Sequence, residues 1–160
     1  MTIEAGSISV GTAIERVNVM ADNVELVRSA YEALARGDVS AMLEVLDENV
    51  EWNQAEHNPY WPGGPFTGRQ AVLEGVLARL GADFDDFTVD VQRVVGCGQT
   101  VLVEARYRAT VKQTGKPLDA QVAHIWDFRD GKTVRWQQYS DTWQFAEVMG
   151  FDPTLPPTAA

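Results

Sequence analysis

Two segments near the C-terminus, residues 118–128 and 133–143, mix aliphatic, aromatic and polar residues as strands do, and residues 129–132 join them. Asp130-Gly131 predicts a tight hairpin turn, because glycine adopts a positive φ without steric cost. A hairpin that only packs would keep its polar groups on one face. Here the polar residues occupy both odd and even positions and so both faces: Gln121, His124, Gln137, Gln138, Tyr139 and Asp141. We therefore expect this hairpin to form one wall of a small-molecule pocket.

The first half of the chain shows helical spacing instead. A helix is predicted to begin at Asp22-Asn23, which are favoured N-cap residues, and to end at Gly37. Shorter helices are predicted over residues 41–46, 69–80 (stopped by Gly81) and 142–149. The inner face of the first helix would carry Val24, Val27, Tyr31 and Leu34.

Alternation predicts further strands over residues 49–54, 84–95 and 100–112. The loop between residues 54 and 69 is rich in proline and glycine but also aromatic, so it either closes the pocket as a lid or packs over the open end of the core. Residues 1–22 show no clear period and are predicted to be a flexible leader, partly helical near residues 14–20. The proline-rich residues 151–160 are predicted to be an extended or disordered tail.

This order of elements is two helices, a strand, a helix and four strands in hairpin sequence. It predicts a single α+β domain over residues 23–150, with three helices of the N-terminal half packed on the concave face of a cone-shaped, curved, mostly antiparallel sheet. A curved sheet closed by helices naturally leaves a pocket between the layers.

Composition narrows the classes of partner. The formal net charge of −10 argues against nucleic acid and against anionic membrane surfaces, whose phosphates would repel the chain. No apolar run has the length of a transmembrane helix, and the N-terminus lacks the basic start and apolar block of a signal peptide. The single cysteine, Cys97, rules out an internal disulfide and is typical of a reducing compartment, so we expect a cytoplasmic protein.

Three segments carry a family resemblance: VRSAYEALARGDVSAMLEVLDENVEW, FTGRQAVLEGVL and AHIWDFRDGKTVRWQQYSDT. Together they resemble the SnoaL-like branch of the nuclear transport factor 2-like superfamily over about residues 22–150. The shared features are a Gly-Asp after the first helix, a tryptophan ending the first strand, a Gly-Arg before the third helix, and a last strand with Tyr-x-Asp. Relatives include ketosteroid isomerases, polyketide cyclases, limonene-type epoxide hydrolases, dehydratases and non-catalytic binding proteins.

The resemblance to ketosteroid isomerases implies three site positions, and they are only partly kept here. The helical oxyanion tyrosine falls on Ala30, with Tyr31 one step away. The base aspartate falls on Gln54, an amide that takes no proton at neutral pH. The second oxyanion donor falls on His124, so steroid-type isomerisation is disfavoured.

The other relatives point to Asp141. In the epoxide hydrolases the final aspartate of the last strand activates water, and Asp141 matches it, but their Arg-x-Asp pair has no match around residues 104–108. The SnoaL-like cyclases also carry an aspartate near the end of the final strand. Those enzymes need no metal or organic cofactor, which implies none for this chain.

Asp141 and His124 are the predicted catalytic residues. A carboxylate at the mouth of an apolar cone would have a raised pKa and could act as general base; alternatively, Asp141 caps the helix that follows it. A neutral histidine can donate to an enolate or shuttle a proton; alternatively, His124 is satisfied by a backbone group or a tyrosine. If the two side chains share one dry chamber, they form an acid/base pair.

The remaining candidates are pocket-wall and polar residues. Glu56 could be a second acid at the pocket rim or a solvated loop residue. No H-x-H or H-E-x-x-H spacing occurs, so no metal site is predicted. The predicted substrate-binding residues are Tyr31, Trp52, Gln54, Glu56, Trp126, Trp136, Gln138 and Tyr139.

The sequence favours a cofactor-independent acid/base enzyme, an aldol-type cyclase, isomerase or dehydratase, acting on a small, mostly apolar carbonyl compound. In this mechanism Asp141 takes a C–H proton while His124 and Gln54 stabilise the oxyanion. The alternatives are a non-catalytic binding module for a hydrophobic ligand and an epoxide hydrolase-like protein with an incomplete relay. A homodimer is also predicted, with Val101, Val103 and Trp143 on the outer face of the sheet.

Overall fold

The structure, a computed structural model, describes residues 10–152; residues 1–9 of the predicted leader and residues 153–160 of the predicted tail lie outside the described residues. The helical segments are α1 (Val10–Ala35), α2 (Val39–Glu44), α3 (Arg69–Val72), the π-helical turn η1 (Leu73–Leu77), α4 (Ala78–Asp83) and α5 (Thr142–Met149). The strands are β1 (Leu46–Asn53), β2 (Phe66–Thr67), β3 (Phe84–Cys97), β4 (Thr100–Val111), β5 (Pro117–Arg129) and β6 (Lys132–Ser140).

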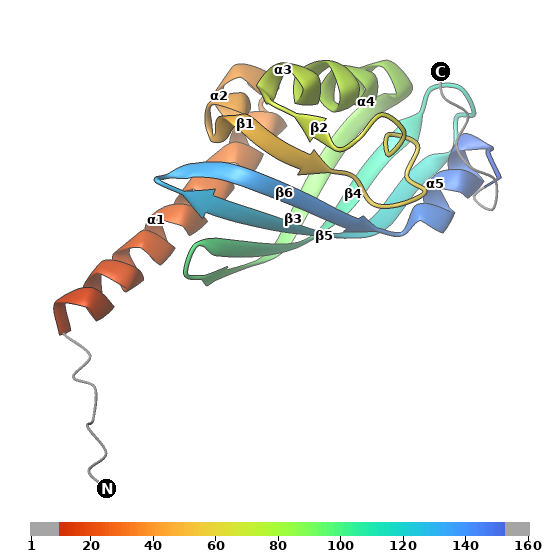
Figure 1. Ribbon diagram of the computed structural model, residues 1–160. Coiled ribbons are helices and arrows are strands. Elements are labelled where there is room, and N and C mark those ends of the chain that lie inside the picture. Colours follow the sequence, from red (N-terminus) through yellow and green to blue (C-terminus); the bar gives the residue numbers. More distant parts are fainter. Residues whose placement is uncertain (1–9, 153–160) are drawn as a thin grey trace, which may run out of the picture.

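These strands form one curved, unclosed sheet in the order β2-β1-β6-β5-β4-β3. Neighbouring strands are antiparallel except β1 and β6, which run parallel. Helices of the N-terminal half lie against this sheet, and α5 follows directly on β6 at the sheet's other end (Figure 1). The predicted α+β architecture is confirmed.

The predicted hairpin turn lies between β5 and β6. Asp130 and Gly131 have φ of 51° and 72°, the pair of positive values that a two-residue turn of this hand requires. The hairpin places His124 opposite Gln138 and Trp126 opposite Trp136. Because side chains alternate along a strand, all four point to the core face.

The first helix differs from its prediction. α1 begins at Val10, well before the predicted start at Asp22-Asn23, and it includes residues 14–20, which were predicted to be partly helical. The first turns of α1 extend away from the sheet (Figure 1). Asn23 is not an N-cap. It is 2% exposed in the middle of the helix, and its amide nitrogen lies 3.4 Å from the Gly98 carbonyl oxygen and 3.3 Å from Gln99 Oε1. The Asn23 side chain ties α1 to the turn between β3 and β4 instead of starting a helix.

The third predicted helix is continuous from Arg69 to Asp83 and does not stop at Gly81. Its middle turn, η1, is π-helical, a local widening that is frequent at functional sites. Gly75 within this turn has a packing reason, because a Cβ there would overlap the ring of Phe66.

The core lies between the helices and the concave face of β4, β5 and β6. Val101, Val103, Ala105 and Tyr107 alternate inward from β4 and are buried. At the centre, the rings of Trp52 and Trp136 stack with centroids 3.7 Å apart.

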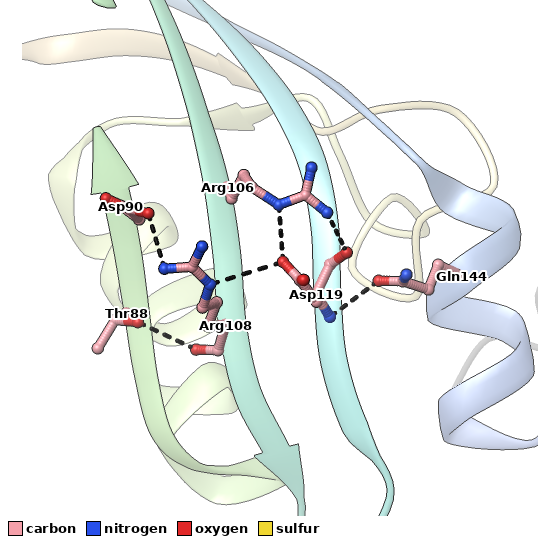
Figure 2. A network of polar contacts seen from close by, with 6 residues as sticks. All are labelled: Thr88, Asp90, Arg106, Arg108, Asp119 and Gln144. Carbon is pink, nitrogen blue, oxygen red and sulfur yellow. Dashed lines mark hydrogen bonds and ion pairs between the residues drawn. The ribbon is translucent and has the colours of Figure 1, made fainter. Parts of the chain in front are cut away.

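The outer face of the sheet carries charged side chains from β3, β4 and β5. Arg106 Nε lies 2.7 Å from Asp119 Oδ1, and Arg108 bridges Asp119 at 3.7 Å and Asp90 at 2.7 Å (Figure 2). Gln144 of α5 accepts a hydrogen bond from the Asp119 backbone N–H at 2.9 Å, which joins the helix to this network of ion pairs. The Asp119 carboxyl has a lowered pKa, chiefly through its hydrogen bond with Arg106.

Val101 and Val103 do not belong to this outer face, so that part of the dimer prediction is wrong. Both are buried in the core, because the outward parity of β4 is even-numbered. The exposed large apolar residues of the described range are Val95, Leu102, Tyr139 and Trp143. Within that range no helix is long and apolar enough to cross a membrane.

Candidate functional site: an inner cavity with a tyrosine–histidine array

An inner cavity of about 40 Å³ lies between the concave face of the sheet and the helices. A water molecule needs roughly 10–15 Å³ measured in this way, so the cavity as it stands holds about three waters, and a larger ligand must push its walls apart. Its apolar wall comes from α1, α2, η1, α4 and α5 together with β1, β3 and β6. The polar side chains that line it are Tyr31, Gln54, Asn58, Tyr60, Tyr107, His124 and Gln138.

A second, larger hollow of about 810 Å³ lies on the outer face of the sheet. It is open, and its lining includes the exposed Arg93–Glu104 ion pair. Water competes for polar groups in such a place, whereas the inner cavity encloses converging polar groups in an apolar wall. We therefore take the inner cavity as the candidate site.

His124 lies at the centre of a buried hydrogen-bonded array. Its Nδ1 lies 2.6 Å from the hydroxyl oxygen of Tyr31, and its Nε2 lies 2.7 Å from that of Tyr107. His124 comes from β5, Tyr107 from the neighbouring β4 and Tyr31 from α1, so helix and sheet meet at this ring. Each hydroxyl oxygen therefore touches a different nitrogen of one imidazole.

Two further donors close the array. The Trp126 indole N–H donates to the Tyr31 hydroxyl at 3.1 Å, and the Gln138 amide nitrogen donates to the Tyr107 hydroxyl at 2.8 Å. The Gln138 amide oxygen in turn accepts from the backbone N–H of Ala55 at 3.2 Å. Five residues from one helix and three strands are thus held in a single chain of hydrogen bonds.

Burial keeps this array uncharged. Desolvation lowers the pKa of His124 to about 3, so the imidazole is neutral at physiological pH. Burial likewise raises the pKa of Tyr31 and of Tyr107, so both phenols keep their hydrogens. The array can donate and accept protons, but an ion inside it would be strongly disfavoured.

Several buried N–H groups beside the cavity have no partner among the described residues: Trp52 Nε1, Asn58 Nδ2 and Trp136 Nε1. The Trp136 indole N–H is nevertheless close enough to Tyr31 to oppose the rise in the tyrosine's pKa. Unpaired donors outnumber unpaired acceptors here, and this surplus favours a ligand that brings acceptor atoms.

The loop after β1 closes the cavity. The Tyr60 hydroxyl donates to Asp83 Oδ2 at 2.7 Å, and the Arg79 guanidinium lies 4.7 Å from the centre of the Tyr60 ring. The Asn58 side-chain oxygen accepts from the Tyr60 backbone N–H at 3.0 Å. α4 thus holds the aromatic loop over the site.

Most predicted site residues are brought together. Tyr31, Trp52, Gln54, His124, Trp136 and Gln138 line the cavity, and Trp126 is buried behind Tyr31. Glu56 is exposed and does not line it. Tyr139 is 57% exposed and lines the outer hollow, because it has the opposite parity to Gln138 on β6.

The prediction that Asp141 and His124 share one chamber is wrong. β6 ends at Ser140, and Asp141 is the N-cap of α5, where its carboxylate accepts from the Gln144 backbone N–H at 3.1 Å. The side chain is exposed and lines the outer hollow. No carboxylate is among the described residues that line the inner cavity.

Sequence reasoning missed Tyr107 as a site residue. The available signal was a tyrosine among the otherwise apolar odd-numbered positions of β4. A buried tyrosine hydroxyl needs a hydrogen-bond partner. Asn58 was also missed, within a loop that gives no periodic signal. No group of three or more His, Cys, Asp or Glu side chains in the described part of the chain is placed to hold a metal ion.

Comparisons with known proteins agree with this geometry at the level of the fold. A nuclear transport factor 2-like protein from Burkholderia thailandensis is 30% identical, with a TM-score of 0.76, and the match covers 79% of this chain and 96% of that one. A putative polyketide cyclase from Xanthomonas campestris is 24% identical, with a TM-score of 0.70 over 81% and 97% of the two chains.

A third structure, TerC co-crystallised with polyporic acid, is 24% identical, with a TM-score of 0.72 over 81% and 98% of the two chains. No curated protein matches the chain. The model of the SnoaL-like domain family matches residues 27–136, which is more than half of the sequence and includes both Tyr31 and His124. The chain therefore belongs to the SnoaL-like domain family.

Proposed function

We propose that the inner cavity binds a small, mostly apolar carbonyl compound and catalyses proton transfer at the carbon beside its carbonyl group. This is the chemistry shared by isomerases, aldol-type cyclases and dehydratases that use no cofactor. The observation that carries the proposal is the neutral His124 ring held between two tyrosine hydroxyls at the wall of the inner cavity. A carbonyl oxygen is the kind of acceptor that these hydroxyls and the unpaired N–H groups suit.

The proposed catalysis differs from the sequence-based hypothesis in its acid and base. Asp141 has no part in it, because its carboxylate caps α5. A hydroxyl donor in a dry site can stabilise an enolate-like oxygen as its charge grows, and a positioned acid or base contributes about 10²–10⁴-fold in rate. Gln54 lies among the lining residues as a further amide that can contact the ligand.

Binding can be tested with 2,4-pentanedione, a small apolar dione, and ¹⁵N-labelled protein. The five tryptophans provide separate indole N–H signals. We expect the signals of Trp52, Trp126 and Trp136 to shift on titration, while that of the exposed Trp143 stays unchanged as an internal control. Shifts confined to Trp143, or none, would contradict binding in this cavity.

Catalysis can be tested with the same compound. Its keto and enol forms differ in ultraviolet absorbance, so the approach to their equilibrium can be followed after dilution into buffer. We expect the protein to accelerate this interconversion and the Tyr31→Phe variant to lose most of the acceleration. Tyr139→Phe is a matched control, because it also removes a tyrosine hydroxyl but on the outer face.

A non-catalytic binding module is the second candidate. It is favoured by the lack of a carboxylate among the described lining residues, since a strong base is the usual partner in carbon deprotonation. Indole shifts without acceleration of enol formation would select it. The placement of Asp141 removes the water-activating residue that an epoxide hydrolase-like function would need.

We also propose that the outer face of the sheet pairs with a second copy of the chain. Val95, Leu102 and Tyr139 expose apolar surface in the outer hollow, and this hollow also carries charges of both signs that can pair across a two-fold axis. Sedimentation velocity should show a dimer that Leu102→Glu dissociates, with Ser40→Glu on α2 as the control. A monomer at micromolar concentration would contradict this proposal.

A further inference from the structure

One of the two tyrosine hydroxyl hydrogens in the array has no acceptor. A neutral imidazole carries a single N–H. If Nδ1 carries it, this group donates to Tyr31 and the Tyr107 hydroxyl donates to Nε2, so the hydrogen of Tyr31 is unused. If Nε2 carries it, the hydrogen of Tyr107 is unused instead. Both arrangements satisfy the same heavy-atom distances of 2.6 and 2.7 Å.

The outer partners do not take up this hydrogen. The Trp126 indole is a donor only, so it cannot accept from Tyr31. The Gln138 amide could in principle be reversed, but its oxygen must face the Ala55 N–H, which leaves its NH₂ group facing Tyr107 as a donor. Each hydroxyl oxygen therefore receives a hydrogen bond from outside the triad. The unused hydrogen is left for a ligand, because both tyrosines line the cavity.

We propose that Tyr31, His124 and Tyr107 form a neutral proton relay whose unused hydrogen can stand at either tyrosine, and that it acts on an enolisable carbonyl ligand spanning the two hydroxyls. This inference rests on the proposed function and deepens it, because it makes Tyr107 an equal partner of Tyr31. It supplies the acid and the base from one array without a carboxylate.

The forward step moves four protons by one place each, written here with the carbonyl at Tyr31. The Tyr31 O–H gives its proton to the carbonyl oxygen, and Nδ1–H gives its proton to the Tyr31 oxygen. The Tyr107 O–H gives its proton to Nε2, and the ligand C–H gives its proton to the Tyr107 oxygen. The C–H electron pair forms the C=C bond of the enol, and the C=O π pair becomes the new O–H bond.

After this step every group is again neutral, and His124 has changed tautomer. The unused hydrogen now stands on Tyr107 and can be delivered to the same carbon or to a conjugated one, while Tyr31 takes back the enol proton. This second step restores the first tautomer, so the cycle closes without any other reactant. Because no ion forms, the relay avoids the desolvation penalty that raises the pKa of both tyrosines and lowers that of the histidine.

The relay and a simple oxyanion site predict different effects on the rate when one of the two tyrosine hydroxyls is removed. With a single donor, only the tyrosine at the carbonyl would matter for the rate. With the relay, Tyr31→Phe and Tyr107→Phe should each lower the rate of 2,4-pentanedione enol formation by about 10²–10⁴-fold, while indole shifts on titration persist. Tyr139→Phe is the matched control and should keep the wild-type rate.

The outcomes separate the relay from the function on which it rests. If the wild-type protein binds and accelerates but a folded Tyr107→Phe variant keeps the full rate, the relay is overturned and the proposed function stands. If the wild-type protein binds without acceleration, or does not bind, the proposed function fails and the relay with it.

A second measurement needs no variant. The ¹⁵N shifts of His124 report which nitrogen carries the hydrogen. The relay predicts that saturation with 2,4-pentanedione changes the proportion of the two tautomers in the wild-type protein. A single tautomer that ligand binding leaves unchanged would overturn the relay even if a phenylalanine variant failed to fold.

Discussion

The Tyr31 hydroxyl oxygen lies 2.6 Å from Nδ1 of His124, although the two residues are 93 positions apart in the sequence. Two features of the fold produce this contact. The Asn23 amide binds the turn between β3 and β4, which fixes the axis of α1 two turns before Tyr31. The antiparallel register of β4 and β5 brings Tyr107 to the other side of the same imidazole.

The buried histidine should make stability depend on pH in a defined window. The pKa of His124 is lowered to about 3 in the folded chain, against about 6.5 when unfolded, so the unfolded chain binds the extra proton first as pH falls. Its contribution is fully present above pH 6.5 and is lost as pH falls toward 3. The total is on the order of 5 kcal/mol.

Urea unfolding of wild type and His124→Gln at pH 7 and pH 4.5 would measure this contribution of His124 to the free energy of unfolding. The other ionisable groups are the same in both proteins, so their contributions largely cancel in the comparison. We expect wild type to lose more stability than the variant on acidification. An equal loss in the two proteins would show that His124 is not held neutral by burial.

Asp141→Ala should act on stability and not on chemistry. Loss of the N-cap of α5 is expected to cost about 0.5–2 kcal/mol, whereas Asp141→Asn keeps a capping oxygen and should cost less. Thermal unfolding of the two variants measures this difference. Enol formation from 2,4-pentanedione should continue at the wild-type rate in Asp141→Asn, and a large loss of rate there would return Asp141 to the mechanism.

Tyr60→Phe should loosen the loop that closes the cavity. The substitution removes the hydrogen bond to Asp83 but keeps the ring beneath Arg79, so a modest loss of about 1 kcal/mol is expected. We expect faster amide hydrogen exchange over residues 55–64 and faster association of 2,4-pentanedione. Tyr139→Phe should change neither rate, and unchanged exchange in Tyr60→Phe would show that the Asp83 contact does not hold the loop.

Gly75→Ala should destabilise the protein although alanine is the better helix former. The added Cβ would overlap the ring of Phe66, and overpacking of this kind typically costs about 1–3 kcal/mol. Gly81→Ala is the matched control, because no atom lies within 4 Å of a Cβ there. Chemical denaturation should show a loss for the first variant and none for the second.

The sequence by itself determined the architecture, because alternation and helical spacing are properties of neighbouring residues. The strand pattern of residues 100–112 and the Asp130-Gly131 turn both formed as the local pattern predicts. Gln54 and His124 were found as site residues through the resemblance to ketosteroid isomerases, whose base and second oxyanion donor fall on these positions, and both line the cavity.

Only the tertiary structure decided which of these groups meet. Asp141 follows directly on a strand that carries an inward Gln138, but the strand ends one residue before it and the carboxylate turns to a helix N-terminus. Tyr107 joins His124 through strand register, and Asn23 becomes a buried tie because another part of the chain supplies its partners. Long-range hydrogen bonds of this kind depend on how α1 crosses the sheet. The spacing of residues along the chain does not predict that crossing.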